Sequence, residues 1–433
     1  MSEPAPEDAH PGGPVETPSG RDGWSPWRAV VGFGVVSLAA DMVYEGARSV
    51  TGPLLASLGA SAVLVGLVTG AGEAVALVLR LVFGSMADRT GRYWTLTMAG
   101  YLLTAVCVPA LAIAPFVGGA GLVLACTLIL AERTGKAVRS PAKTALLAHA
   151  AGAVGMGRGF AVHKALDQLG AVAGPLLVAG IAALTGALWP ALAFLVVPGA
   201  VAVGLLVWIR HRTGDPTDSA DHSTATRSHG SEDPVTAPPP APQRLPAQFW
   251  LFAASAGAAT AGLVTFGVIS FHLTREQVVP IAVVPVIYAA AMAAAAIAAL
   301  VTGWAYERFH GRVLLTLPFL VAAVPAMAFA NAPLTAVAGV LLWGAAVGVQ
   351  DSTVKALVAD LVPARRRATA YGLFAAVQGA AAIGGGAMAG ALYSRSVPTL
   401  VAAVCATQLG ALVFLIATLR HGPRAGVASR RRR

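Results

Sequence analysis

Acidic side chains inside long apolar stretches are the residues of this sequence best placed to do chemistry. Asp41 and Glu45 share one such stretch with Arg48, and spacings of four and three residues put all three on one helix face. Glu73 lies in the middle of the next stretch, with no basic residue within one helical turn. A carboxyl group held away from bulk water can bind and release a proton, so we predict that these acids take part in proton coupling.

Each of these acids also has a plain structural interpretation. Glu45 could form an ion pair with Arg48, and Glu73 could be a protonated carboxyl that hydrogen-bonds to a neighbouring helix. In the functional interpretation, the isolated Glu73 carboxyl is protonated at rest and could bind a proton, a sodium ion or a cationic substrate.

Other polar residues in the apolar stretches are further candidates. His163 and Asp167 lie four residues apart and could form a proton relay, although a lone histidine in such a stretch more often makes a helix–helix hydrogen bond. The candidates for contact with a substrate are polar or aromatic: Tyr44, Gln168, Trp343 and Gln378.

The composition shows which elements must hold these residues. Of the 433 residues, 56% are hydrophobic and only 12% are charged, against about 25% charged in ordinary soluble domains. A chain so poor in charge could not cover a soluble surface, which excludes a soluble enzyme, a disordered chain and a secreted disulfide scaffold. The net charge is +10, but the basic residues lie mostly in short loops between apolar runs, so no nucleic-acid partner is expected.

The sequence motifs do not indicate an enzyme. The three cysteines, Cys107, Cys126 and Cys405, lie inside apolar runs without ligand spacing, so neither a metal site nor a disulfide framework is expected. The sequence contains no paired histidine motif, nucleophile elbow or phosphate loop placed after a strand. We therefore expect neither an enzyme nor a cofactor.

The apolar runs predict an all-α integral membrane protein with twelve transmembrane helices. A spanning helix needs about 20 residues, and these runs are continuously apolar, whereas barrel strands would alternate over about 10 residues. The expected spans lie near residues 28–50, 61–87, 94–115, 119–138, 158–184, 187–210, 247–272, 279–306, 313–330, 334–358, 368–392 and 397–420. The expected organisation is a disordered cytoplasmic tail (1–27), a six-helix half (28–210), a flexible cytoplasmic linker (211–246), a second six-helix half (247–420) and a basic tail (421–433).

The distribution of Arg and Lys predicts the orientation. Loops on the side of the termini hold most of the basic residues, Arg139 and Lys143 among them, whereas the opposite side receives only Arg48, Arg275 and Arg395. Because cytoplasmic loops carry the excess of positive charge, both termini of this multi-pass cell-membrane protein are expected to be cytoplasmic. The tail from Arg430 to Arg433 should meet anionic membrane lipids.

An internal repeat relates the two halves. A loop at residues 84–92, after the second span, resembles a loop at 303–312, after the eighth, at an offset of 219 residues with one insertion. The ends of the fourth and tenth spans share this offset. Duplicated halves favour a transporter whose binding site lies at their interface. The residues expected to form an inner gate are Gly84, Asp88, Arg89, Gly91, Arg92, Glu307, Arg308, Arg312, Asp351 and Lys355.

Twelve spans, a polar central loop and the sequence Gly84…Asp88-Arg89-Thr90-Gly91-Arg92 together resemble the major facilitator superfamily, over about residues 28–420. The resemblance implies that the two halves rock around a central site. In the loop, Arg89 and Arg92 could pair with Asp88 or with acids on neighbouring helices, and such an ion network could latch the outward-open state. Alternatively, these arginines only mark the cytoplasmic side.

Two further segments resemble parts of that superfamily. Gly170, Gly174 and Pro175 in the fifth span are similar to the helix-bending Gly-Pro motif of its antiporters, although close packing alone would also use small residues. Arg133 is the nearest match to an arginine of the fourth span that the superfamily links to proton movement. The alternative for Arg133 is a charge cluster at the inner end that pairs with the loop motif.

The sequence therefore favours a secondary active transporter, with proton-coupled efflux of a lipophilic or cationic small molecule. Proton-driven uptake of a small metabolite is the alternative, because the same acids serve both directions. A non-transporting membrane sensor or assembly protein is the alternative from another class. The expected partners are a small-molecule substrate, the proton and membrane lipids, and a monomer is expected.

Overall fold

The computed structural model describes residues 25–152, 154–213, 245–363 and 366–421. The expected tails (1–27 and 421–433) and the expected linker (211–246) therefore fall outside the described residues except at their ends. The described residues form helices and turns, and none of them lies in a β-strand.

The first half consists of six passes, some of them built from two or three consecutive segments. Its helices are α1 (Pro26–Ser49), α2 (Thr51–Ser57), α3 (Ala62–Thr90), α4 (Tyr93–Ala110), η1 (Leu111–Phe116), η2 (Gly118–Ala120), α5 (Gly121–Gly152), α6 (Met156–Thr185), α7 (Leu188–Phe194) and α8 (Val196–Thr213).

The second half repeats this plan. Its helices are α10 (Ala247–Gly262), α11 (Phe266–Arg275), η3 (Ile281–Val283), α12 (Val284–Phe309), η4 (His310–Leu315), α13 (Thr316–Ala328), α14 (Pro333–Leu361), α15 (Arg367–Arg395) and α16 (Val397–His421).

The expected twelve-helix architecture is confirmed. Ten helical stretches of the described residues are long and apolar enough to cross a membrane, and one of them, Ile281–Ala328, contains the two passes α12 and α13. α5 is the remaining pass. It falls outside the ten because its charged residues begin at Glu132, well before the helix ends.

The fourth pass differs from the expectation in length. The span was expected to end at residue 138, with Arg139 and Lys143 in a loop, but α5 continues through Pro141 to Gly152. A proline inside a helix removes one backbone hydrogen bond, and packing of the flanking residues must offset that loss. Arg139 supplies such packing, because it is only 4% exposed and donates a hydrogen bond of 2.5 Å to Thr104 on α4.

Local signals fix several helix ends. Ser25 caps α1 by accepting a hydrogen bond from the Arg28 backbone N–H at 3.4 Å, and Pro26 occupies the first helical position. α3 is capped at its C-terminal end by Gly91, whose φ of 64° lies in the left-handed region. This conformation explains the glycine of the loop motif, because other residues adopt it at a cost.

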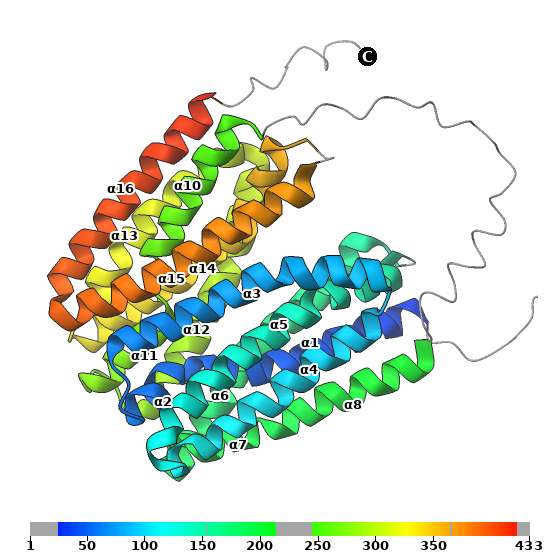
Figure 1. Cartoon of the computed structure of the whole chain (residues 1–433), viewed down its shortest axis with the longest axis horizontal. Coiled ribbons are helices and arrows are strands. Elements are labelled where there is room, and N and C mark those ends of the chain that lie inside the picture. The colour runs from blue at the N-terminus through cyan, green and yellow to red at the C-terminus, as the bar shows by residue number, and fades with distance from the viewer. Residues whose placement is uncertain (1–24, 153, 214–244, 364–365, 422–433) are drawn as a thin grey trace, which may run out of the picture.

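The two halves lie against each other along two pairs of helices (Figure 1). α3 runs beside α15, and α6 runs beside α12. Small residues bring α3 and α15 close together: a Cβ added at Gly66 would overlap the backbone of Gly386, and one at Gly390 would overlap that of Ala62. Close backbone approach of this kind is the usual means of helix association in membranes.

The end of the molecule away from the chain termini, the closed end, joins the halves. There α2 packs on α11, where a Cβ added at Gly52 would overlap the backbone of Gly267. The hydroxyl oxygens of Thr69 and Thr265 lie 2.7 Å apart. One hydrophobic cluster runs through residues of both halves, Val50 and Phe271 among them.

The other end, the terminal end, is where α1 and α10 begin and α8 and α16 end. Its apolar residues in the first half, such as Phe33, Trp94 and Ile209, form a separate cluster of first-half residues only. Lys164 on α6 and Asp351 on α14 are within electrostatic reach across the halves, yet both are exposed. The halves are in contact along α3 and α15 as far as Leu81 and Gly372, but beyond that point the charged residues that face each other are exposed, so the terminal end is the more open one.

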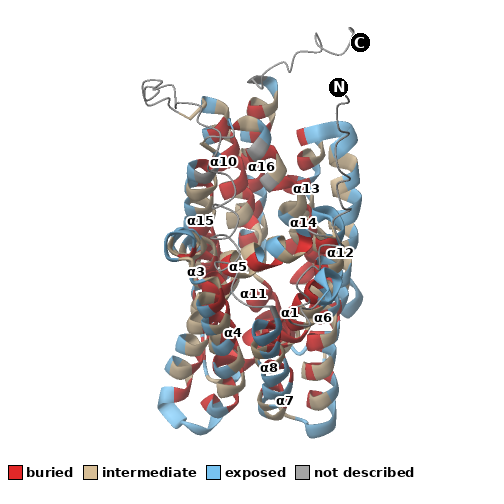
Figure 2. Ribbon diagram, turned by 90° about the vertical axis from the view of Figure 1, so that its right-hand side faces the viewer, coloured by how far each residue is buried: buried red, intermediate tan, exposed pale blue. Residues whose placement is uncertain are grey.

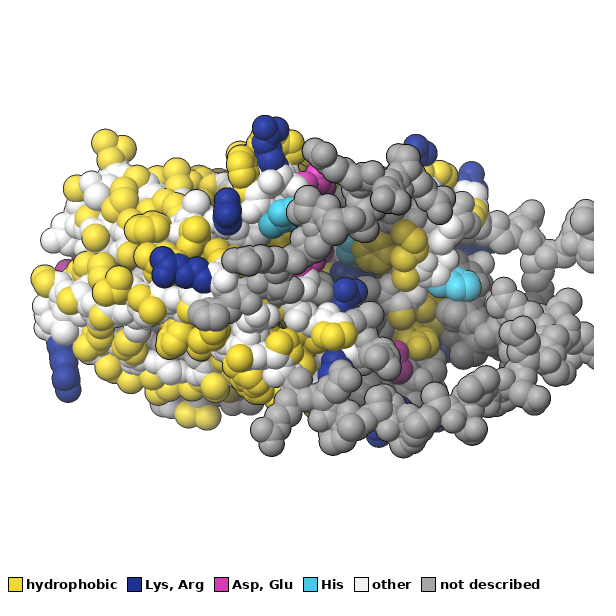
Figure 3. Space-filling view, turned by 90° about the horizontal axis from the view of Figure 1, so that it is seen from above, with side chains coloured by type: hydrophobic (Ala, Val, Ile, Leu, Met, Phe, Trp, Pro, Cys, Tyr) yellow, Lys and Arg dark blue, Asp and Glu magenta, His cyan; other side chains and the backbone are white. Residues whose placement is uncertain are grey.

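The outer surface suits a lipid environment. Large apolar side chains point outward on several helices, among them Leu184 (89% exposed), Leu334 (87%) and Trp304 (66%). Hydrophobic side chains are widespread on the part of the face in Figure 3 that the grey residues leave visible. Buried residues gather inside each group of helices and exposed ones outside (Figure 2).

Candidate functional site

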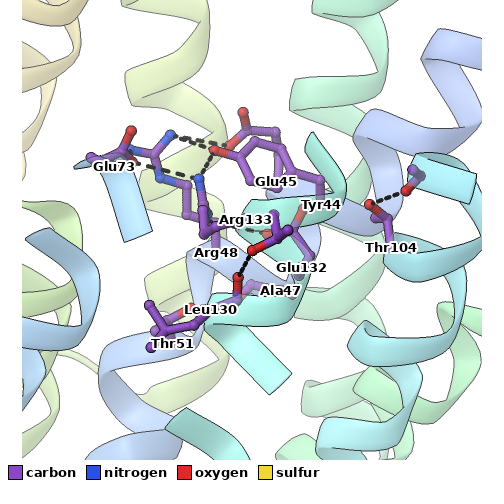
Figure 4. Close-up of polar contacts among 12 residues, drawn as sticks. Tyr44, Glu45, Ala47, Arg48, Thr51, Glu73, Thr104, Leu130, Glu132 and Arg133 are labelled. Atoms are coloured by element: carbon purple, nitrogen blue, oxygen red, sulfur yellow. Dashed lines mark hydrogen bonds and ion pairs between the residues drawn. The ribbon is translucent and has the colours of Figure 1, made fainter. Parts of the chain in front are cut away.

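A network of charged side chains occupies the centre of the first half (Figure 4). Glu73 on α3 lies 2.7 Å from Arg48 on α1 and 3.5 Å from Arg133 on α5. Its side chain is 33% exposed, so water reaches it. The expectation that Glu73 is isolated is wrong, because its basic partners come from other helices and spacing along α3 could not reveal them.

Tyr44 holds the cations of this network together. Its hydroxyl oxygen accepts hydrogen bonds from Arg48, at 3.1 Å, and from Arg133. The Lys136 ammonium lies 3.6 Å from the centre of the Tyr44 ring, a cation–π arrangement. Tyr44 itself is 1% exposed, so it acts within the protein and is not open to a substrate as the sequence suggested.

Glu45 joins the network to the second half. The carboxylate lies 3.9 Å from Arg48 and accepts a hydrogen bond from the Tyr288 hydroxyl on α12. Both side chains are buried. The expected pair of Glu45 with Arg48 exists. Glu45 also contacts Tyr288, which is 243 residues away in the sequence, so this carboxylate links the two halves.

Asp41 and Asp167 form a second acidic centre between α1 and α6. Their carboxyl groups are close enough to interact electrostatically. Arg139 lies 3.9 Å from Asp41, and Lys164 lies 2.6 Å from Asp167. Two neighbouring carboxylates repel each other when both are ionised, so a proton bound to one of them would relieve the repulsion.

His163 does not pair directly with Asp167. Its Nε2 lies 2.8 Å from the hydroxyl of Ser37, which also accepts a hydrogen bond from Lys143 at 3.0 Å. The side chain is 7% exposed. The simpler expectation, a histidine that bonds to a neighbouring helix, matches this geometry.

Arg133 belongs to the central network and does not lie with the loop motif. It is 7% exposed, and besides Glu73 it pairs with Glu132 at 3.3 Å. Between the two interpretations of Arg133, the position supports the one in which it faces a central carboxylate.

Sequence reasoning missed how many basic side chains face this interior. Lys136, Arg139 and Lys143 all lie on α5 within the bundle, and two of them were assigned to a loop. Their spacings of three and four residues along an unbroken helix could have revealed one shared face. The acids inside the first half would favour a cationic substrate only if they stood alone, but a base lies within 4.0 Å of each of Asp41, Glu45, Glu73, Glu132 and Asp167.

The loop motif lies at the terminal end, between α3 and α4. Asp88 accepts a hydrogen bond from the Tyr93 hydroxyl at 3.4 Å. Arg89 and Arg92 are exposed, and neither makes an ion pair with any described residue. A Cβ at Gly84 would meet Pro141 only at an ordinary distance of 3.7 Å. At this more open end, the predicted latch is not formed.

The repeated loop in the second half is equally open. Glu307, Arg308 and Arg312 are exposed at the terminal end. Asp351 faces the first half, where Arg80 and Lys164 are within electrostatic reach. The side chain of its expected partner, Lys355, lies outside the described residues.

The glycines of the fifth span serve helix packing. A Cβ at Gly170 would overlap the backbone of Leu38 on α1, and one at Gly174 would overlap that of Met42. α6 continues unbroken through Pro175. The motif therefore holds α6 against the helix that carries Asp41.

The remaining substrate candidates are engaged within the protein. Trp343 is buried, and its indole N–H donates to the Val264 carbonyl at 2.8 Å. Gln168 donates to the Met292 carbonyl across the halves at 2.9 Å. Gln378 makes only a long contact of 3.4 Å to Thr260, and it keeps the most freedom to bind a ligand.

Comparison with known proteins identifies the family. The sequence profile of the Major Facilitator Superfamily matches residues 33–308 and 251–432, so this chain belongs to that superfamily and is a multi-pass membrane protein. An uncharacterised protein of Mycobacterium tuberculosis is 52% identical over 398 residues, which are 92% of this chain and 94% of that protein. A protein of Mycobacterium bovis matches to the same extent.

Solved transporter structures share the fold. The peptide transporter POT in complex with sulfate has a TM-score of 0.68 at 15% identity and covers 92% of this chain and 94% of its own. The nucleoside transporter NupG has a TM-score of 0.63 at 13% identity, covering 90% and 98%. A bacterial homologue of the human lysosomal transporter Spinster, inward-facing and unoccupied, has a TM-score of 0.63 at 14% identity, covering 91% and 95%.

Proposed function

We propose that this chain is a proton-coupled secondary transporter that moves a lipophilic small molecule across the cytoplasmic membrane by alternating access. The carboxyl pair of Asp41 and Asp167 carries this proposal. Ionisable groups inside membrane helices are expensive and mark ion pathways, and a proton bound to this pair would relieve the repulsion between its carboxylates. Lys164 and Arg139 beside it would stabilise the pair after the proton leaves.

We further propose that protonation moves the halves through Glu45. Glu45 accepts the hydrogen bond of Tyr288 from the other half and shares Arg48 with Glu73. Hydrogen bonds to an ionised carboxylate are stronger than those to a neutral one. A proton that arrives on this network therefore weakens the contact between the halves near the closed end.

For the direction of transport, we propose export. The similarity of Gly170, Gly174 and Pro175 to the antiporter motif supports it, and these residues hold α6 against α1, which places the two acids of the pair together. Proton-driven uptake would use the same carboxyls. A sensor or assembly protein would have no need of a proton-binding pair in its interior.

We further propose that both termini and the terminal end face the cytoplasm. The exposed arginines of this end, such as Arg89, Arg92 and Arg312, fit the excess of positive charge on that side. In the described conformation a cytoplasmic compound could then enter. The site lies within one chain, so a monomer suffices for transport.

Efflux from cells tests the proposal. Cells that express the chain are loaded with ethidium, a lipophilic cation, or with carboxyfluorescein, an organic anion, and efflux is followed with and without a protonophore. The variants are Asp41→Asn and Asp167→Asn. Arg158→Gln, an exposed position at the terminal end, is the matched control.

We expect efflux of at least one dye that requires expression and falls several-fold with the protonophore. Both asparagine variants should lose it at equal amounts of folded protein, and Arg158→Gln should keep it. Efflux that persists after the protonophore, or in both asparagine variants, would contradict proton coupling through this pair. Protonophore-sensitive accumulation of a dye would contradict export.

A further inference from the structure

Three partly buried cations of the first half make no ion pair with a described carboxylate. No carboxylate oxygen of the described residues lies within 4.0 Å of Arg80 on α3, or of Lys136 or Lys143 on α5. The Nε of Arg80 is buried without a hydrogen-bond partner. We call these three residues the unpaired cations.

The neighbouring glutamates of the first half are already engaged. Glu73 faces two arginines, Glu132 faces Arg133, and Glu45 faces Arg48 and Tyr288. Charged side chains within membrane helices normally pair with each other or line a polar pathway. Asp351 on α14 lies within electrostatic reach of Arg80, and Asp41 lies within reach of Lys136 and Lys143. Neither carboxylate is in direct contact with these cations. An oxyanion that enters between the halves could therefore contact them directly.

Two of the unpaired cations are within electrostatic reach of the same carboxylate. Arg80 and Lys136 both act on Glu73, and both lie near Tyr44. Lys143 lies seven residues beyond Lys136 on α5, on the same helix face and nearer the terminal end. All three side chains are partly exposed, and Arg80 lies near the second half, within electrostatic reach of Asp351 on α14.

We propose that the transported substrate is an organic anion, whose carboxylate or similar oxyanion binds between Arg80 and Lys136. Lys143 lies on the path that the anion would follow from the terminal end to this site. The guanidinium group offers paired N–H donors that match an oxyanion, and the ammonium group adds a point charge. This inference rests on the proposed transport function and names its substrate class, in place of the cation expected from the sequence.

Thermal unfolding of the purified full-length chain in an uncharged detergent tests this site. Benzoate is the organic anion, sodium chloride at equal ionic strength is the reference, and tetraphenylphosphonium is the competing lipophilic cation. The variants are Arg80→Gln and Lys136→Met, with Arg158→Gln as the control. No proton gradient is present, so the result does not depend on whether coupling occurs as proposed.

We expect benzoate, but not chloride, to raise the unfolding temperature of the wild type and of Arg158→Gln. In Arg80→Gln and Lys136→Met the half-maximal benzoate concentration should rise at least tenfold. Lys136→Met should also unfold at a higher temperature than the wild type without ligand, because it removes an uncompensated charge. Stabilisation by tetraphenylphosphonium instead, or by benzoate equally in all variants, would overturn the proposal, as would the absence of any effect of benzoate on the wild type.

Discussion

At the scale of single residues, Glu73 stands between two guanidinium groups. Arg48 lies 2.7 Å away and Arg133 lies 3.5 Å away, and each has a second acidic neighbour, Glu45 and Glu132 respectively. Loss of the Glu73 charge would leave the two arginines with weaker compensation. It would not strip them of every partner, so the fold should survive the change.

The variant Glu73→Gln should therefore destabilise the chain moderately. Leaving a buried charged group without its partner costs about 3–5 kcal/mol, and the one-third exposure of Glu73 reduces that cost. We expect a lower unfolding temperature in detergent, and recovery in the double variant Glu73→Gln/Arg48→Met, which removes both charges. A single variant as stable as the wild type would contradict the ion pairs described here.

The residue types of the site could be predicted from the sequence, but their partners could not. Asp41, Glu45 and Glu73 stand out because acids are rare in apolar runs. The contact of Glu45 with Tyr288 joins residues 243 positions apart, and no spacing along one helix encodes such a contact. Pairing across helices depends on packing, which a single sequence does not display.

At the scale of elements, the packing of α6 on α1 holds Asp41 beside Asp167. Gly170 and Gly174 face the backbone of α1, where a side chain would overlap it. The span was predicted correctly from its apolar run, and the small residues indicated close packing. Which helix they pack against followed only from the structure.

A pair of glycine variants tests this packing. Gly170→Ala should lower the unfolding temperature and the yield of folded protein, because its Cβ would force α6 away from Leu38. Gly180→Ala lies on the same helix with no atom within 4 Å of its Cβ, and it should be neutral or slightly stabilising. Fluorescence-detected size-exclusion chromatography after heating measures both, and equal behaviour of the two variants would argue against the close contact.

α5 shows why some boundaries could not be predicted. Pro141 and nearby charges suggest the end of a span, yet the helix continues because Arg139 and Lys143 find polar partners on α4 and α1. In sequence, a charged helix segment that faces a polar interior has the same composition as a loop. The cations of the proposed substrate site were missed for this reason.

At the scale of the whole molecule, the two halves meet at the closed end, and the terminal end is the more open one. The internal repeat at an offset of 219 residues predicted two halves with a binding site at their interface, and the family confirms the two-half architecture. The conformation could not be predicted, because the sequence of an alternating-access transporter must be compatible with two conformations, one open at each end.

A disulfide across the closed end should trap the described conformation. The Thr69 and Thr265 hydroxyls are 2.7 Å apart, so the pair Thr69→Cys and Thr265→Cys should cross-link under mild oxidation. Cys107, Cys126 and Cys405 would first be replaced by serine. Transport should fall at least tenfold on oxidation and return on reduction. Full transport by the cross-linked chain would contradict alternating access.

The central claim is that protonation of the first-half carboxyls moves the two halves. Its most direct test is the distance between spin labels at Ser57→Cys on α2 and Gln277→Cys after α11, two exposed positions at the closed end, measured as a function of pH in lipid nanodiscs. Acidification should shift the distribution to longer distances, because it weakens the hydrogen bond from Tyr288 to Glu45. The shift should disappear in Asp41→Asn/Glu45→Gln, which removes one acid of the carboxyl pair and the carboxylate that accepts the Tyr288 hydrogen bond. Distances that do not change with pH in the wild type, or that change equally in the double variant, would contradict the account.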